Sequence, residues 1–372
     1  NPGKDSIVCQ VIDWKDSDFY EQYEKDEDGK TIYDKEKNYR FYEIRGYAIA
    51  DKKYSVCLHI TGFQPYLYIK VPDRWNQRFV FRFQNTLEFK LDKLKSSIVS
   101  CRLVKRKELY GFHNDKKFNF LEIKCHNLGA FYEIRRILQG KKPFWARSDT
   151  DDPNEKTKDR FFNIAGTRYD FSNHLYETNI SPLLRFFHDK EINPAGWVKI
   201  PARKYEVLIG EDIQTRCQLE VKCDIKDLIS LTDKKEISPL VVASFDIECT
   251  SIDGSFPNPA RRGDEVIQIG TTVHKYGEKH CCYKNIITLK KCDEIEGSKV
   301  VECKTESELL LQWAKLIRWI DPDVITGYNI WGFDMIYMDT RCMNGCGGLR
   351  PNFVDMFYEI YSRNKKYPIK RK

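Results

Sequence analysis

The chain has 372 residues, 41% hydrophobic and 31% charged, which is the composition of a soluble globular protein with two or three domains. An aromatic content of 13% argues against intrinsic disorder. The sequence contains no run of about 18 apolar residues, so no membrane-spanning helix is predicted. Lys and Arg number 62 and Asp and Glu 55, and the resulting net charge of +7 is by itself weak support for a polyanionic partner.

Residues 1–39 are polar and charged and are expected to form an extension ahead of the first domain. β-Branched and aromatic residues then predict strands, at 41–50, 54–63, 66–71, 98–104 and 118–125. Apolar residues recur every three or four positions in 76–97 and 129–138, which predicts two helices. The order of strand, helix, strand, strand and helix suggests a small α+β sandwich of the kind that includes RNA-binding folds.

A polar loop over 140–159 precedes a short predicted helix that ends at Lys190. Ser181 is its expected N-cap and Pro182 its first residue. Three strands follow, at 197–200, 205–209 and 218–224. The charged turn at 232–236 is the predicted domain boundary, so the first domain covers 40–236 and the second 237–372.

The second domain opens with apolar strands, at 240–249, 266–275 and 280–289. Thr305 and Glu308 form a capping box in front of an amphipathic helix, which ends at Asp321-Pro322. A buried strand at 324–327 leads to another helix from about Trp331. This pattern predicts an α/β domain with a covered mixed sheet.

Two acidic side chains stand at the end of the first strand of the second domain. Asp246 and Glu248 are two positions apart, so both project from one face, about 6.7 Å apart along the strand. Such carboxylates repel each other and are stable as a pair if a divalent cation lies between them, and hard oxygen ligands suit Mg²⁺ or Mn²⁺. The alternative is a strand that has placed its polar face in water.

A third acidic side chain, Asp334, lies at a strand-to-helix junction. Asn329 is a natural N-cap for the helix. The buried face of the helix is expected to carry Phe333, Ile336 and Tyr337. Asp334 would point another way within the first turn, beside the strand ends. The alternative is that Asp334 is only a favourable charge at a helix N-terminus.

Together, 245–248 (Phe-Asp-Ile-Glu) and 328–334 resemble the first and second exonuclease motifs of the family B DNA polymerases. Adjoining segments resemble the same family, at 254–259, 266–269 and 321–327. The delta type and its relatives in large DNA viruses are the most similar. Three segments resemble the delta N-terminal domain more loosely, at 59–66, 109–113 and 176–186. The resemblance covers about residues 40–345.

The resemblance implies an α+β, nucleic-acid-binding N-terminal domain, followed by an α/β ribonuclease H-like 3′–5′ exonuclease domain that is incomplete at its C-terminus. It implies that Asp246, Glu248 and Asp334 are catalytic ligands of two Mg²⁺ or Mn²⁺ ions, for proofreading hydrolysis at the 3′ end of DNA. The candidates for DNA contact are Phe256, Asn329 and Phe333. Phe256 would stack on the terminal base or else pack under its loop, and Asn329 would orient the strand or else only cap the helix.

The fourth carboxylate of the family, an Asp with a Tyr four residues before it, is not found. Tyr358 and Tyr361 are followed four positions later by Ser362 and Lys365. The polymerase palm motifs are also missing and the first residue is Asn1, which suggests a fragment of a replicative DNA polymerase. These 372 residues alone are therefore expected to have little or no nuclease activity. The alternative is a non-catalytic nucleic-acid-binding module with an exonuclease-like fold.

The implied partners are a DNA primer-template, its single-stranded 3′ end and accessory proteins such as a sliding clamp, with no membrane. Thirteen scattered cysteines without a secretory signal predict reduced thiols and an intracellular location, either the nucleus or a viral replication site. A zinc site needs about four well-spaced ligands. Neither the adjacent cysteines at 281–282 nor the pair Cys342 and Cys346 provides such a set. The basic tail at 363–372 could bind phosphates, direct localisation or belong to an insertion.

Overall fold

The computed structural model describes residues 4–20, 40–50, 54–108, 111–142, 156–157 and 160–344. The chain forms two compact units, the first comprising Asn1–Ile213 and Cys217–Lys235, and the second Gln214–Arg216 and Glu236–Lys372. Several predicted features lie outside the described residues, namely the first two residues of the segment 109–113, most of the loop at 140–159, Cys346, Tyr358, Tyr361 and the basic tail.

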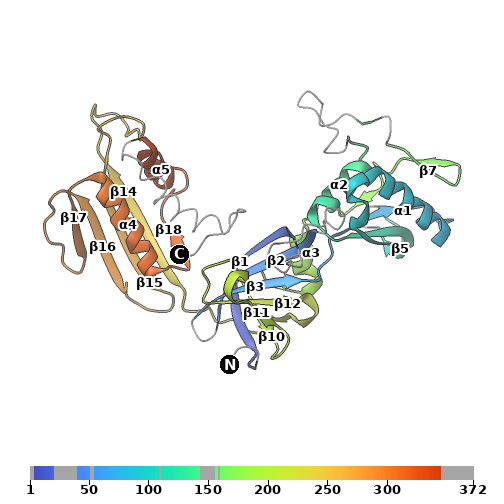
Figure 1. The fold of residues 1–372 in the computed structure, drawn as a ribbon, viewed down its shortest axis with the longest axis horizontal. Coiled ribbons are helices and arrows are strands. Elements are labelled where there is room, and N and C mark those ends of the chain that lie inside the picture. Colours follow the sequence, from blue (N-terminus) through green and yellow to red (C-terminus); the bar gives the residue numbers. More distant parts are fainter. Residues whose placement is uncertain are drawn as a thin grey trace, which may run out of the picture. The chain divides into compact units, whose positions relative to one another are not determined.

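A seven-stranded sheet organises part of the first unit, in the order β11-β12-β3-β2-β1-β10-β13 (Figure 1). Its strands are β1 (Ile7–Tyr20), β2 (Arg40–Ala50), β3 (Ser55–Thr61), β10 (Trp197–Ile200), β11 (Glu206–Val207), β12 (Leu219–Asp224) and β13 (Ile229–Leu231). Helix α3 (Pro182–Lys190) packs on one face through the buried Phe186. The side chain of Ser181 accepts a hydrogen bond from the Leu184 N–H, which confirms the predicted cap.

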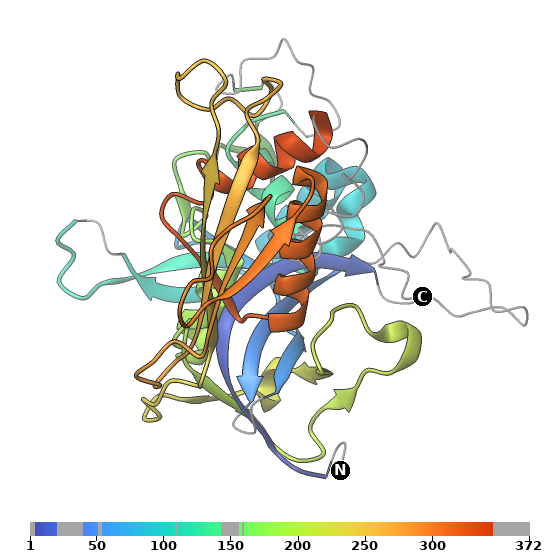
Figure 2. The same cartoon turned by 90° about the vertical axis from the view of Figure 1, so that its left-hand side faces the viewer.

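The structure corrects the predicted polar extension over residues 1–39, because residues 7–20 form β1 inside this sheet. Ile7, Cys9 and Val11 are alternate residues of β1 whose side chains pack in the core. The charged residues in 13–18 make the composition of the segment untypical of a strand, so the strand was not predicted. β1 pairs along its length with β2 and at its start with β10, and its register shifts after Val11. Figure 2 shows its long, curved course.

A four-stranded antiparallel sheet with the order β5-β6-β4-β9 confirms the predicted α+β sandwich. Its elements in chain order are β4 (Tyr66–Lys70), α1 (Gln77–Leu91), β5 (Ile98–Lys107), β6 (Lys117–Cys125), α2 (Leu128–Leu138) and β9 (Leu175–Tyr176). Both helices contribute to its core, α1 with Phe83 and α2 with Phe131. α1 ends six residues earlier than predicted, and the 3-10 helix Asp92–Ser97 completes the segment. A small hairpin, β7 (Phe162–Ile164) and β8 (Thr167–Tyr169), adds Phe162 to this core.

The second unit contains a mixed five-stranded sheet with the order β17-β16-β15-β14-β18. Its strands are β14 (Val241–Cys249), β15 (Val266–Lys275), β16 (Tyr283–Leu289), β17 (Lys299–Cys303) and β18 (Val324–Thr326). Figure 1 shows α4 (Glu306–Ile320) lying along the sheet, and α5 (Asp334–Asn344) follows β18. β17, a short strand at the sheet edge, was not predicted from the sequence.

Helix α4 begins with the predicted capping box. Thr305 Oγ1 accepts from the Glu308 N–H at 3.2 Å, and the Glu308 carboxylate accepts from the Lys304 N–H at 2.8 Å. Trp313, fully buried, packs on Phe245 of β14 with ring centroids 4.7 Å apart. The core beneath α4 therefore fixes the strand that carries the two acidic residues.

All cysteines in the described segments are free thiols, as predicted. None of the described helices is both long and apolar enough to cross a bilayer.

Candidate active site

Asp246 and Glu248 project from the same face of β14. Both are exposed, whereas the alternating Phe245 and Ile247 point into the core. Within the described residues neither carboxylate makes a hydrogen bond or an ion pair, so their oxygens are available to a ligand. The neighbouring strand contributes Gly270 directly opposite Asp246, and a Cβ there would meet nothing within 4 Å. This part of the sheet surface is therefore open beside the carboxylates.

Asp334 lies directly beside these two residues. Its Oδ1 accepts a hydrogen bond at 3.2 Å from the N–H of Ile247, the residue between Asp246 and Glu248. Burial raises the pKa of Asp334 above its usual range, and the nearby charge of Asp246 raises it further, against hydrogen bonds from the backbone. Three acidic residues from two separated segments thus lie near one another at one end of the sheet.

The parallel pairing of β14 with β18 explains this meeting. β18 pairs with Val242–Ser244 and ends there, so the chain after it emerges beside Asp246. Gly327 allows the close approach, because a Cβ at this position would lie 2.5 Å from the Phe245 carbonyl oxygen. The following turn delivers Asp334 at the first residue of α5.

The turn between β18 and α5 is longer than predicted, since α5 begins at Asp334 and not near Trp331. Asn329 has a left-handed φ of 52°, and its carbonyl accepts from the N–H groups of Gly332 and Phe333. Its side chain is exposed beside Gly332. The prediction that Ile336 is buried is wrong, because its side chain is 56% exposed. The prediction that Tyr337 is buried is confirmed.

Phe256 stands on the loop that follows β14. Its side chain is 77% exposed, which contradicts the alternative that it packs into the core. Its ring contacts that of Phe333 edge to face at 5.5 Å, and Phe333 in turn contacts Tyr337 at 5.3 Å. The exposed ring of Phe256 thus packs against the ring of Phe333, which directly precedes α5.

The loop is held in shape by a buried carboxylate. Asp264 is fully buried and accepts hydrogen bonds from the N–H groups of Ile252 and Asn258, at 3.0 and 2.8 Å. Arg261 donates to Asp264 at 2.8 Å and to the Phe256 carbonyl at 3.0 Å. These contacts fix the backbone on both sides of Phe256.

A buried ion pair connects this loop to both helices. Arg341 of α5 binds Glu306 of α4 through two hydrogen bonds, at 2.9 and 2.7 Å, with both side chains 5% exposed. Arg341 also donates to the carbonyls of Pro259 and Arg261, at 3.3 and 3.2 Å. Glu306 accepts from the Val266 N–H at 2.8 Å. Sequence reasoning missed this pair, because 35 residues separate its members and no local pattern joins them.

The carboxylate oxygens fit a hard divalent cation. All three donors are oxygens, two of them are free of protein partners in the described part of the chain, and hard oxygen ligands suit Mg²⁺ or Mn²⁺. The ligand atoms of the three residues do not all lie within 4.8 Å of one another, as expected for like charges that repel. A cation between them would offset this repulsion.

Comparisons with known proteins agree with this arrangement. The family described as DNA polymerase family B, exonuclease domain, matches residues 173–369, which is more than half of the chain. The family described as DNA polymerase delta catalytic subunit-like, N-terminal domain, matches residues 62–129.

Individual relatives give the same result. A DNA polymerase of Acanthamoeba polyphaga mimivirus is 30% identical over 90% of this chain and 18% of its own length. The DNA polymerase delta catalytic subunit of Schizosaccharomyces pombe is 32% identical over 92% of this chain and 28% of its own length. The chain therefore spans less than a third of either relative.

A solved structure shows a similar fold. The family B DNA polymerase of the archaeon Pyrobaculum calidifontis matches with a TM-score of 0.53 and 16% identity, over 91% of this chain and 32% of its own length.

Proposed function

The chain belongs to the family B DNA polymerases, and from this premise we propose that its second unit carries a metal-dependent 3′–5′ exonuclease site. Asp246, Glu248 and Asp334 would hold the cations. The observation that carries the proposal is the hydrogen bond from the Ile247 N–H to Asp334, which brings the third carboxylate beside the other two. The exposed face of Asp246 and Glu248 leaves room for a DNA strand above them.

When bound, two Mg²⁺ or Mn²⁺ ions would supply an activated water and would stabilise the charge that develops on the phosphodiester oxygens. The chain's own contribution is positional. Asp334 is rigidly placed, because it is 2% exposed and bonded to the β14 backbone. Asp246 and Glu248 stand on a strand whose opposite face is packed under Trp313. Rigid elements of this kind hold ligands more accurately than loops do.

The DNA strand would be bound by side chains around the carboxylates. Phe256 offers an exposed ring on which the terminal base can stack, and Phe333 supports that ring from below. The exposed amide of Asn329, in the turn that leads to Asp334, can hydrogen-bond the sugar or phosphate. Stacking accepts every base, which suits an enzyme that removes whichever nucleotide is wrong.

At the level of the whole protein, we propose proofreading within a replicative DNA polymerase that acts on a primer-template. Support comes from the relatives named DNA polymerase and DNA polymerase delta catalytic subunit. Such a protein would act at the nucleus or at a viral replication site, with a sliding clamp as a candidate accessory partner.

We expect the intact protein to shorten 5′-labelled single-stranded DNA stepwise from its 3′ end in the presence of Mg²⁺ or Mn²⁺. A primer with a mismatched 3′ end should be shortened faster than a matched one, because its end frays into a single strand. A chelator should stop the reaction, and added Mg²⁺ should restore it. DNA binding with no cleavage would instead support the non-catalytic binding module, and cleavage that needs no metal ion would contradict the proposed metal site.

The stacking role of Phe256 predicts a loss of kcat/KM for this hydrolysis in Phe256→Ala. Base stacking on an aromatic ring contributes about 1–3 kcal/mol, so the loss should be about fivefold to 150-fold. The matched control is Phe89→Ala, because Phe89 is 86% exposed on α1 in the other unit. A substrate whose terminal nucleotide lacks its base should be hydrolysed equally by wild type and Phe256→Ala. A difference that persists on this substrate would rule out stacking.

A further inference from the structure

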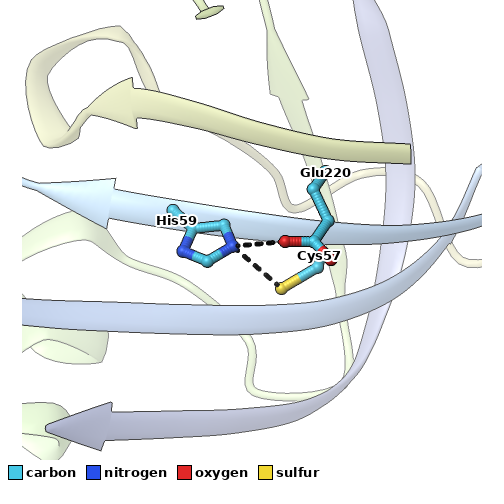
Figure 3. Close-up of side chains that lie close together, drawn as sticks. All are labelled: Cys57, His59 and Glu220. Carbon is cyan, nitrogen blue, oxygen red and sulfur yellow. Dashed lines mark hydrogen bonds and ion pairs between the residues drawn. The ribbon is translucent and has the colours of Figure 1, made fainter. Parts of the chain in front are cut away.

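A second group of chemically active side chains lies in the first unit, on the face of the seven-stranded sheet opposite the apolar core. Cys57 and His59 alternate along β3, and Glu220 of β12 is in register with Cys57 (Figure 3). All three are buried, with exposed fractions of 0%, 1% and 2%. Among the described residues they are the one group of three or more metal-ligating side chains whose ligand atoms all lie within 4.8 Å of one another.

The distances in this group match those between the ligands of a tetrahedral zinc ion. His59 Nε2 lies 3.6 Å from Cys57 Sγ and 3.1 Å from Glu220 Oε2. Zinc binds nitrogen at about 2.0–2.1 Å, sulfur at about 2.3 Å and carboxylate oxygen at about 2.0–2.2 Å, which with tetrahedral angles gives N···S of about 3.6 Å and N···O of about 3.4 Å. These two distances therefore lie within a few tenths of an ångström of those around a tetrahedral zinc ion, and the third, between Cys57 Sγ and a Glu220 oxygen, is at most 4.8 Å.

The other nitrogen of His59 has the partner that a metal-bound imidazole needs. Glu43 Oε2 lies 3.2 Å from His59 Nδ1 and accepts at 2.9 Å from Arg45 Nε. A proton on Nδ1 donated to Glu43 leaves the Nε2 lone pair directed at Cys57 and Glu220. Carboxylates that accept from a ligating histidine in this way orient the ring and raise its basicity.

Charge balance is compatible with a cation at this position. Glu43 pairs with Arg45, and the Glu220 carboxylate lies 3.1 Å from His59 Nε2. A divalent ion that displaces one proton from His59 and one from Cys57 leaves the net charge unchanged. A proton on His59 is therefore the competitor of the metal.

We propose that Cys57, His59 and Glu220 bind a zinc ion in the first unit, with Glu43 as the positioning residue for His59. The thiolate selects a borderline-soft metal such as zinc over Mg²⁺, whose site in the second unit is made of oxygens alone. Cys217 packs in the same buried cluster as Cys57 and is a candidate for a fourth ligand. The ion would join β3 to β12, two strands 163 positions apart in their register, and would stabilise the sheet. This site is independent of the exonuclease proposal.

The test measures zinc bound per chain in the intact protein, after chelation, exposure to one equivalent of zinc and desalting. Wild type should retain zinc, and Co²⁺ in its place should give the absorption of a thiolate-to-cobalt charge transfer. Cys57→Ala and Glu220→Gln should each lose one zinc per chain. Cys223→Ala, which removes a buried thiol from the opposite face of β12, and Asp246→Ala with Glu248→Ala should retain it.

Wild-type protein that retains no zinc and shows no thiolate–cobalt absorption would overturn the proposal, whether or not the variants fold. His59 would then be a protonated partner in a purely ionic network. Equal zinc content in wild type and Cys57→Ala would overturn it as well. Glu43→Gln provides a second readout, because loss of the carboxylate behind a ligating histidine should weaken zinc binding by about 10-fold to 100-fold while saturating zinc still fills the site.

Discussion

Replacing both Asp246 and Glu248 with Ala should reduce hydrolysis of DNA 3′ ends in the intact protein by about 10³-fold or more, because ligands that act as one unit are lost together. Asp334 alone would hold a cation poorly, since it is buried and carries a raised pKa. Both replaced side chains are exposed on β14 and have no hydrogen bond within the described residues, so the fold should tolerate their loss. Nucleotide addition, the reaction proposed for the whole polymerase, should be largely spared, because neither side chain is expected to belong to its metal site.

The measurement is the initial rate at which an end-labelled primer is shortened without nucleotides, followed by extension of the same primer when nucleotides are added. The matched control is Glu294→Ala with Glu296→Ala, an exposed acidic pair with the same spacing, which removes the same charge from the second unit. Primer shortening at the wild-type rate in the Asp246 and Glu248 double variant would show that these carboxylates are not the metal ligands.

Arg341→Met should destabilise the second unit by about 3–5 kcal/mol, the cost of leaving one member of a buried ion pair without its partner. Glu306 would keep its charge at 5% exposure, lose both hydrogen bonds from Arg341 and keep the one from the Val266 N–H. The carbonyls of Pro259 and Arg261 would also lose their donor. Because these carbonyls belong to the loop that carries Phe256, exonuclease activity should fall as well.

Hydrogen exchange can locate this effect. Amides of α4 and β15 should lose protection in Arg341→Met, whereas amides of β2 and β3 in the first unit serve as an internal reference. Arg318→Met is the matched control, since Arg318 is exposed on α4 and such changes usually stay within about 0.5 kcal/mol. Unchanged protection of α4 in Arg341→Met would mean that the ion pair contributes little to stability.

Most helices and many of the strands were predictable from the sequence alone, because their signals are local. Asn76 and Thr305 cap helices where the sequence predicts helix starts, and Ser181 with Pro182 starts α3 as expected. Capping bonds and apolar periodicity both act within a few residues. The same locality explains the errors. The charges in β1 and the short length of β17 weaken the period-two signal, and only pairing with neighbouring strands stabilises them.

For the functional side chains too, some features follow from the local sequence and others from contacts between distant residues. Strand alternation alone placed Asp246 and Glu248 on one face, and a motif resemblance singled out Asp334. Tertiary structure decided what surrounds them: the bond from Ile247 to Asp334, the exposure of Phe256, the pair of Arg341 with Glu306. It also decided that Cys57, His59 and Glu220 meet. Such contacts join residues tens to more than a hundred positions apart, and only the register of the folded sheets and helices, driven by burial of their apolar faces, brings them together.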